Sequence, residues 1–224
     1  DVMLTILAVI ACASVLQTAG GLNVMMKVAE RVLRRHPSYI TILAPITTWT
    51  LTVLCGTGHV VYTMFPIIYD ISIKKGIRPE RPMAVASIAS QMGIGASPVS
   101  VSVVSMVSIL AASHGIGKAV GILDLLSISI PSTFIGVIAA ALWSMNRGKD
   151  LDKDAEFQAK LQDPEQKEYI YGATNTLQDT VFPKEAYWAT WIFFAGIAGV
   201  VLLGSFPSLL PKFGAVGKLK PMSM

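Results

Sequence analysis

Long apolar stretches separated by short polar segments set the pattern of this chain. Residues 2–19 are apolar apart from Gln17 and a few small hydroxyl side chains. At about 1.5 Å of rise per residue, a helix of this length crosses a membrane once. We therefore predict a membrane span over residues 2–19, which ends at Gly20 and Gly21.

Residues 22–35 show a different pattern, in which apolar side chains recur at helical spacing and charged ones take the opposite face. This pattern predicts a basic amphipathic helix that lies in the membrane interface. A calmodulin-target helix has a similar pattern, but a position between two apolar stretches favours the interface. The predicted apolar face holds Leu22, Met25, Met26, Ala29, Val32 and Leu33, and the charged face holds Lys27, Glu30, Arg31 and Arg34.

Residues 39–73 form one apolar stretch that the sequence Gly56-Thr57-Gly58-His59 interrupts near its middle. The stretch is too long for one span, and two full spans with a turn need about 40 residues or more. Basic residues flank both ends, so the positive-inside rule places both ends in the cytoplasm. We predict a re-entrant helical hairpin, and two short spans joined by a tight outer turn are the alternative. The flanking residues are Arg34, Arg35, Lys74, Lys75, Arg78 and Arg81.

A second broken span is predicted over residues 82–113, with its break at residues 96–100. Pro98 suits the first turn of a new helix, and Ser97 suits the N-cap before it. The span is expected to reach the outer face at residues 114–118. A further span over residues 120–145, kinked near Pro131, then returns the chain to the cytoplasm.

The rest of the chain is predicted to hold a polar cytoplasmic loop, one more span and a tail. Residues 146–187 are the polar loop, and residues 188–205 are the span, with Tyr187, Trp188 and Trp191 as an interfacial aromatic belt. We interpret residues 1–145 as one membrane repeat and residues 206–224 as a truncated tail. Since the chain opens on Asp1 inside an apolar run, we expect it to be a fragment of a larger protein.

Composition supports the membrane interpretation. Hydrophobic residues make up 53% of the chain and charged residues 14%, with a mean hydropathy of +0.58, whereas soluble domains carry about 25% charged residues. The chain is therefore expected to be an all-α integral membrane protein in the lipid bilayer. Its net charge of +4 fits cytoplasmic loops, and the absence of a basic patch interleaved with aromatics argues against nucleic acid. Cys12 and Cys55 lack the spacing of a metal site.

The two breaks in the apolar stretches are the candidate binding site. A helix break at membrane depth is tolerated only where it is buried in protein or lines a cavity. In transporters the free N–H groups at such a half-helix point at an anionic substrate. We predict a carboxylate cradle with His59, an ionisable residue at mid-depth, tuning it; a histidine satisfied by neighbouring backbone is the alternative. The cradle residues are Gly56, Thr57, Gly58, Ser97, Pro98 and Ser100.

Other polar residues have weaker functional interpretations. Asp70 is more typical of a membrane boundary, while Arg78 and Arg81 suit either an anion guide at the cytoplasmic mouth or simple topology. No nucleophile, base and orienting group occur together, and there is neither a P-loop nor a nucleotide fingerprint. We therefore expect no enzyme activity, no cofactor and no metal.

Three blocks of the sequence carry a family resemblance over nearly the whole chain. They read CGTGHVVYT, GIRPERPMAVASIASQMGIGASPVSV and RGKDLDKD. The chain resembles the anaerobic four-carbon dicarboxylate transporter (Dcu) family, and looks closest to its fumarate/succinate antiporter branch. The resemblance implies an inverted-repeat secondary transporter of the bacterial inner membrane, multi-pass, of which this chain looks like an incomplete first half with one repeat only.

The resemblance also implies what is carried. Such proteins take up fumarate, malate or aspartate and release succinate during anaerobic respiration, and some partner a membrane sensor kinase. We further expect a homo-oligomer. Two alternatives remain open at this stage: an anion channel or uniporter that uses the same dipoles, and a regulatory membrane partner of a dicarboxylate sensor kinase.

Overall fold

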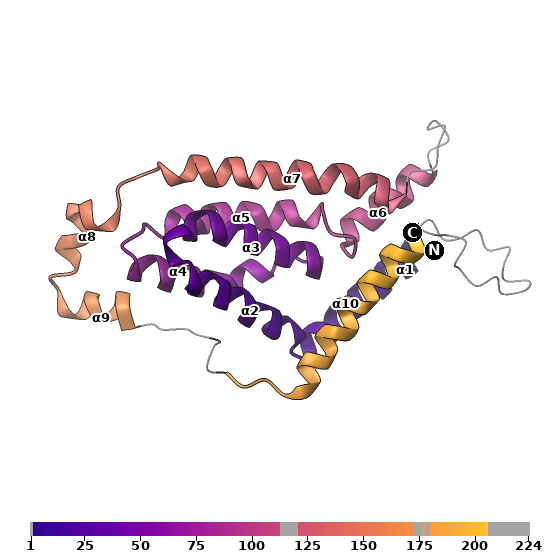
Figure 1. Cartoon of the computed structure of the whole chain (residues 1–224), viewed down its shortest axis with the longest axis horizontal. Helices are drawn as coiled ribbons and strands as arrows, with labels where there is room; N and C mark the ends of the chain where they lie inside the picture. The colour runs from indigo at the N-terminus through magenta and orange to yellow at the C-terminus, as the bar shows by residue number, and fades with distance from the viewer. Residues whose placement is uncertain (1, 113–120, 173–176, 178–179, 206–224) are drawn as a thin grey trace, which may run out of the picture.

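The structure, a computed structural model, describes residues 2–112, 121–172, 177 and 180–205. Over these residues it is helical and contains no strand (Figure 1), which agrees with the expected all-α fold. The predicted outer turn at residues 114–118 and the tail at residues 206–224 lie outside the described residues. The helices are α1 (Val2–Thr18), α2 (Gly21–Arg35), η1 (Pro37–Tyr39), α3 (Ile40–Cys55), α4 (Val60–Lys74), α5 (Glu80–Ile94), α6 (Val101–Ala112), α7 (Ile122–Met145), η2 (Leu151–Lys153), α8 (Ala155–Lys160), α9 (Pro164–Gly172) and α10 (Lys184–Ser205).

The first break divides the apolar stretch 39–73 into α3 and α4. Gly56 ends α3 with a φ of 72°, and its N–H donates to the carbonyl of Thr52 at 2.8 Å. Glycine is the usual residue at such a left-handed helix end because it has no Cβ to clash. The helix α4 starts again at Val60, so the residues between the two helices are those that the sequence marked as the interruption.

The second break separates α5 from α6, and its cap lies later than the sequence suggested. Val103 donates its N–H to Ser100 Oγ at 3.2 Å, and Val104 donates to the Ser100 carbonyl at 3.2 Å, so Ser100 is the N-cap of α6. The assignment of Ser97 as the cap, with Pro98 in the first helical turn, is therefore wrong. Ser97 Oγ instead accepts a hydrogen bond from the N–H of Val99 at 3.3 Å. The serine therefore closes a tight local turn around Pro98.

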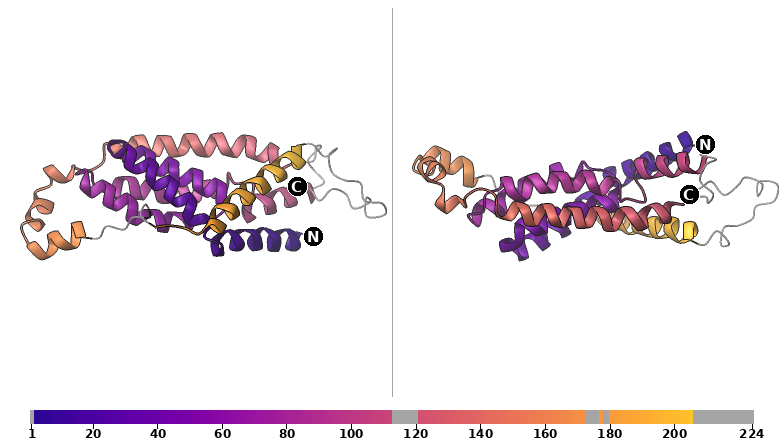
Figure 2. Two further views of the ribbon diagram at one scale, coloured as in Figure 1. Left: turned by 60° about the horizontal axis from the view of Figure 1, so that its bottom comes forward. Right: turned by 90° about the horizontal axis from the view of Figure 1, so that it is seen from above.

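Three helices, α3, α5 and α7, pack along one another as the centre of the fold, with α2 and α4 on one side (Figure 1 and Figure 2). Gly93 of α5 allows a close approach to α3, since a Cβ there would lie 2.9 Å from the Cβ of Thr52. Trp49 of α3 donates its indole N–H to Thr133 of α7 at 3.2 Å. The helix α7 runs through Pro131 as one continuous helix.

The amphipathic helix α2 does not keep its charged face in solvent. Glu30 is fully buried and accepts from Arg34 at 2.7 Å and from the N–H of Leu177 at 2.8 Å. Arg34 also pairs with the buried Asp70 of α4 at 3.0 Å, and Lys74 pairs with Asp70 at 2.6 Å. Burial lowers the pKa of the Arg34 guanidinium, but hydrogen bonds and charge attraction from Glu30 and Asp70 outweigh burial and leave that pKa raised. An ion cluster thus joins α2 to α4.

The start of the predicted polar loop is docked on the turn between α4 and α5. Arg81 donates to the carbonyls of Arg147 and Gly148, the latter at 2.8 Å, and pairs with Asp150 at 2.8 Å. Leu151 is buried and donates its N–H to the Gly76 carbonyl at 3.0 Å. We call residues 147–154, in this docked arrangement, the clasp.

The polar segment also contains helical structure that the sequence interpretation did not include. The short helices η2, α8 and α9 lie within it, and α10 begins at Lys184, ahead of the expected residue 188. Ala186 donates its N–H to the Pro183 carbonyl at 3.1 Å, so Pro183 opens the helix, and Glu185 suits its positive N-terminal end. Charged residues therefore extend the helix beyond the apolar run.

Two helical segments in the described part of the chain are long and apolar enough to cross a membrane, Pro37–Cys55 and Ile122–Met145. The first of them includes α3, which was expected to form one arm of the re-entrant hairpin. That segment alone has the length of one membrane span.

Candidate functional site

The two helix breaks touch each other. Gly56 faces the backbone of Val99 so closely that a Cβ at position 56 would lie 2.8 Å from the Val99 carbonyl oxygen. Real Cβ atoms do not approach a backbone oxygen to that distance, so glycine at 56 is what lets the breaks meet. Segments that are more than 40 positions apart in the chain therefore form one structural unit.

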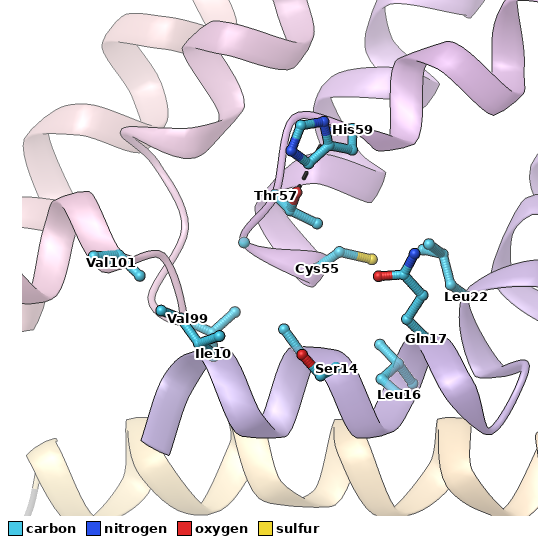
Figure 3. A pocket seen from close by; sticks show the side chains of 12 residues that line it. Ile10, Ser14, Leu16, Gln17, Leu22, Cys55, Thr57, His59, Val99 and Val101 are labelled. Atoms are coloured by element: carbon cyan, nitrogen blue, oxygen red, sulfur yellow. Dashed lines mark hydrogen bonds between the residues drawn. The ribbon is translucent and has the colours of Figure 1, made fainter. Parts of the chain in front are cut away.

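A cavity of about 330 Å³ lies beside this contact. Its volume is at the lower end of the range for small-molecule sites, which is about 300–1,000 Å³. Figure 3 shows the cavity between α1 on one side and the two breaks on the other. It is lined by Ile10, Ala13, Ser14, Leu16, Gln17, Leu22, Cys55, Gly56, Thr57, His59, Val99 and Val101.

Four side chains supply most of the polarity of this cavity. Thr57 and His59 come from the first break, and Ser14 and Gln17 come from α1. The sequence identified the first two and missed the two on α1. The signal for Gln17 was present, because it is the polar interruption of the apolar run 2–19. Its partner across the cavity could not be known before the fold placed α1 against the breaks.

His59 borders the cavity and is exposed. Its backbone N–H donates to Thr57 Oγ1 at 3.4 Å, which closes the turn that leads into α4. Its ring stacks on Tyr62, with ring centroids 6.1 Å apart. Among the described residues, no group of three His, Cys, Asp or Glu side chains could hold a metal ion.

Gly58 and Ser90 tie the first break to α5. Ser90 is fully buried and donates its hydroxyl to the Gly58 carbonyl at 2.8 Å. A Cβ at Gly58 would lie 3.0 Å from Ile94 and 3.1 Å from Ser90 Oγ. Gly58 therefore supports the break from behind and does not line the cavity.

The second break contributes to the cavity through residues other than the predicted ones. Ser97 and Ser100 are fully buried, and their hydroxyls are held by backbone N–H groups of their own segment. Neither they nor Pro98 line the cavity, whereas Val99 and Val101 do. Of the seven predicted site residues, the structure brings Gly56, Thr57 and His59 to the cavity, and Gly58, Ser97, Pro98 and Ser100 shape the breaks around it.

The basic residues of the predicted cytoplasmic mouth are paired. Arg81 is occupied by the clasp, and Arg78 pairs with Glu80 at 2.7 Å and with Asp154 at 3.3 Å. These contacts give both arginines a packing role, which the two interpretations drawn from the sequence, an anion guide and membrane topology, did not include.

The amino-acid sequence of the chain matches a known protein family. Residues 1–224 match the family described as "Anaerobic c4-dicarboxylate membrane transporter". The chain is 56% identical over its whole length to the anaerobic C4-dicarboxylate transporter DcuB of Escherichia coli O157:H7, and covers 49% of that protein. It is 36% identical to the C4-dicarboxylate transporter DcuA of Helicobacter pylori, over 92% of the chain and 44% of the relative. The chain thus spans about half the length of these relatives, and no solved structure matches it significantly.

Proposed function

Because the chain belongs to the family of anaerobic C4-dicarboxylate membrane transporters, we propose that it contributes to a secondary transporter for four-carbon dicarboxylates. On this proposal the protein is multi-pass in the bacterial inner membrane and exchanges external fumarate, malate or aspartate for internal succinate. The family is one of transporters, which agrees with the expectation that the chain is not an enzyme.

The observation that carries the proposal is the contact of two helix breaks beside a small cavity. Each break interrupts a long apolar stretch, and such interruptions in membrane proteins are found where backbone lines a binding cavity. The contact between Gly56 and Val99 brings both interruptions to one place. A four-carbon dicarboxylate is a small anion, and a cavity of about 330 Å³ suits a ligand of that class.

The chemistry of the lining supports reversible binding of an anion. The cavity offers the hydroxyl of Thr57, the imidazole of His59 and the amide of Gln17, and none of the described residues that line it is a lysine or an arginine. A lysine or arginine side chain would add a full opposite charge to its hydrogen bonds with a carboxylate and hold it more strongly. A carboxylate bound without such an ion pair can therefore be released again, which a transport cycle requires.

The proposal extends to the arrangement of the whole protein. Transporters of this type place the substrate between two repeats, and the matched relatives are about twice as long as this chain. On the proposal, a second repeat closes the open side of the cavity. The expected homo-oligomer belongs to the same proposal, as does a sensor kinase that docks on α2 or on the acidic segment before α10.

The test is an exchange assay with a full-length transporter that carries this chain, reconstituted in liposomes. Uptake of labelled fumarate is compared between liposomes loaded with succinate and liposomes loaded with buffer. The proposal expects uptake that depends on internal succinate. Uptake that is indifferent to the internal content indicates a uniporter or channel, and no uptake of any four-carbon dicarboxylate contradicts the proposed substrate.

A further inference from the structure

One wall of the cavity is not part of the two breaks. The helix α1 presents Ser14 and Gln17 to the same space that Thr57 and His59 border from the other side. Figure 3 shows the Gln17 side chain extending from α1 toward the Cys55 end of the first break, with His59 further along that wall. A ligand in the cavity would therefore contact α1 as well as the breaks.

The Gln17 amide is available for a ligand. Within the described residues, no hydrogen bond engages its side chain, and the α1 residues that line the cavity beside it are apolar or small. A polar amide on a membrane helix commonly serves to bond across a helix interface. Here the surface that the amide faces is a cavity, so its partner has room to be a bound molecule.

The Gln17 amide differs chemically from a backbone N–H group. Backbone N–H groups of a helix start can only donate hydrogen bonds, which suits a carboxylate. A glutamine amide has two N–H donors and a carbonyl oxygen that accepts. Its NH₂ group can therefore donate a hydrogen bond to a carboxylate oxygen of the ligand. At the same time its carbonyl oxygen can accept a hydrogen bond from a hydroxyl or ammonium group on the ligand carbon next to that carboxylate.

We propose that Gln17 is a substrate-binding residue that distinguishes four-carbon dicarboxylates bearing a hydroxyl or ammonium group on carbon 2 from unsubstituted ones. Its carbonyl accepts the hydrogen bond of that substituent, and its NH₂ group donates to the neighbouring carboxylate. This inference rests on the proposed dicarboxylate function and adds to it the residue that sets substrate preference.

The other polar residues of the cavity are less suited to this role. Thr57 Oγ1 already accepts the N–H of His59, and the imidazole stacks on Tyr62. The side chain of Ser14 is short, and a serine hydroxyl in a helix often donates its hydrogen bond to a backbone carbonyl of the preceding turn. Of the two polar side chains of α1 that line the cavity, Gln17 is the longer. Its carbonyl oxygen carries no hydrogen and can only accept a hydrogen bond.

The experiment compares Gln17→Met with the unchanged protein in a full-length transporter that carries this chain. Methionine keeps the length of the side chain and removes both the donors and the acceptor. Uptake of labelled fumarate, L-malate and L-aspartate is measured in succinate-loaded liposomes. Since one hydrogen bond changes affinity by roughly three- to tenfold, and more when one partner is charged, we expect malate to lose about that factor relative to fumarate. Aspartate should lose more.

The matched control is Gln166→Met. Gln166 is exposed on α9 and does not line the cavity, so the ratios among the three substrates should stay unchanged. A second comparison, Ser14→Ala, removes the hydroxyl of α1 that lines the cavity.

The outcomes distinguish a failure of the proposed function from a failure of the role assigned to Gln17. If the unchanged protein takes up no four-carbon dicarboxylate, the proposed function fails. If it exchanges them but Gln17→Met leaves the substrate ratios as they were, or lowers all three equally, the assignment of Gln17 is overturned. The same holds if Ser14→Ala shifts the ratios and Gln17→Met does not.

Discussion

A single glycine determines how closely the two breaks approach each other. Gly56 has a left-handed backbone conformation. It also lies so close to the second break that a Cβ at this position would be 2.8 Å from the Val99 carbonyl oxygen. Either condition alone favours glycine, and together they leave no side chain that fits without moving backbone. The geometry of the cavity therefore depends on one missing methyl group.

Gly56→Ala is expected to lower both stability and transport. A left-handed alanine costs about 1–2 kcal/mol, which corresponds to a drop of about 2–8 °C in apparent melting temperature for a chain of this size. The added Cβ also pushes Val99 away, so transport should fall further than stability alone explains. Thermal unfolding in detergent and exchange in liposomes measure the two effects.

Gly95→Ala is the matched control for this substitution. Gly95 stands at the start of the second break, but its φ is −71° and the atom nearest to an added Cβ would be 3.7 Å away. Alanine fits there, so stability should be unchanged or slightly higher. Equal losses in the two variants would show that the Gly56 contact has no special role.

The site residues could be predicted from the sequence only in part, and the reason is physical. Glycines and a histidine inside an apolar run stand out without any structure, and Gly56, Thr57 and His59 do border the cavity. The serines of the second break also stand out, but Ser97 and Ser100 satisfy backbone N–H groups. Hydrophobic pattern alone does not reveal whether a hydroxyl serves its own backbone or an open cavity.

At the scale of helices, the link between α2 and α4 is a buried ion cluster. Asp70 is nearly inaccessible and forms ion pairs with Arg34 of α2 and Lys74 of α4. Removing one partner from a buried pair is costly because it leaves the others without compensation. Here Arg34 and Lys74 are partly exposed, at 27% and 44% of their side-chain surface, so solvent reduces that cost.

Asp70→Asn is expected to destabilise the protein by about 1–3 kcal/mol, because it removes the carboxylate that Lys74 pairs with and leaves Arg34 paired with Glu30 alone. Glu80→Gln serves as the comparison, since Glu80 also pairs with an arginine but is 76% exposed. That surface pair should contribute less than about 1 kcal/mol. Thermal unfolding of both variants in the same detergent measures the difference, and similar losses would contradict a structural role for the buried cluster.

Helix positions were easier to predict than helix ends. Continuous apolar runs locate most of the long helices, and the helical spacing of apolar residues locates α2. The ends depend on which of several capping groups is used: Ser100 caps α6 in place of Ser97, and Pro183 opens α10. Glu30 illustrates the same limit, since its burial depends on Leu177, a distant residue that no local pattern connects to it.

At the scale of the whole molecule, the basic segments gather at one end. Arg34 near the end of α2 contacts Asp70 of α4, and Gly76 contacts Leu151 beyond α7. Figure 1 shows the ends of α2, α4 and α7 and the start of α5 on the side of α8 and α9, with the start of α1 and the end of α10 opposite. From the positive-inside rule, we predict that these segments share the cytoplasmic side.

Cysteine labelling tests this convergence. In a background with Cys12→Ser and Cys55→Ala, the variants His36→Cys, Lys75→Cys and Lys149→Cys place a thiol at three exposed positions of this end. We expect a membrane-impermeant maleimide to label all three from the cytoplasmic side alone. His114→Cys, at the outer turn predicted from the sequence, should react from the opposite side. Labelling of positions 36 and 75 from opposite sides would contradict a chain that leaves and returns on one side.

The clasp also divides the polar segment into a fixed part and an outlying part. Residues 147–154 are held by Arg81 and by the buried Leu151, whereas α8 and α9 contain no buried residue. The joint between α8 and α9, at residues 161–163, is therefore a suitable place to insert a compact soluble domain. Such an insertion would give a chain of 24.0 kDa the visible landmark that particle alignment in electron cryomicroscopy requires, while the helices around the cavity stay untouched.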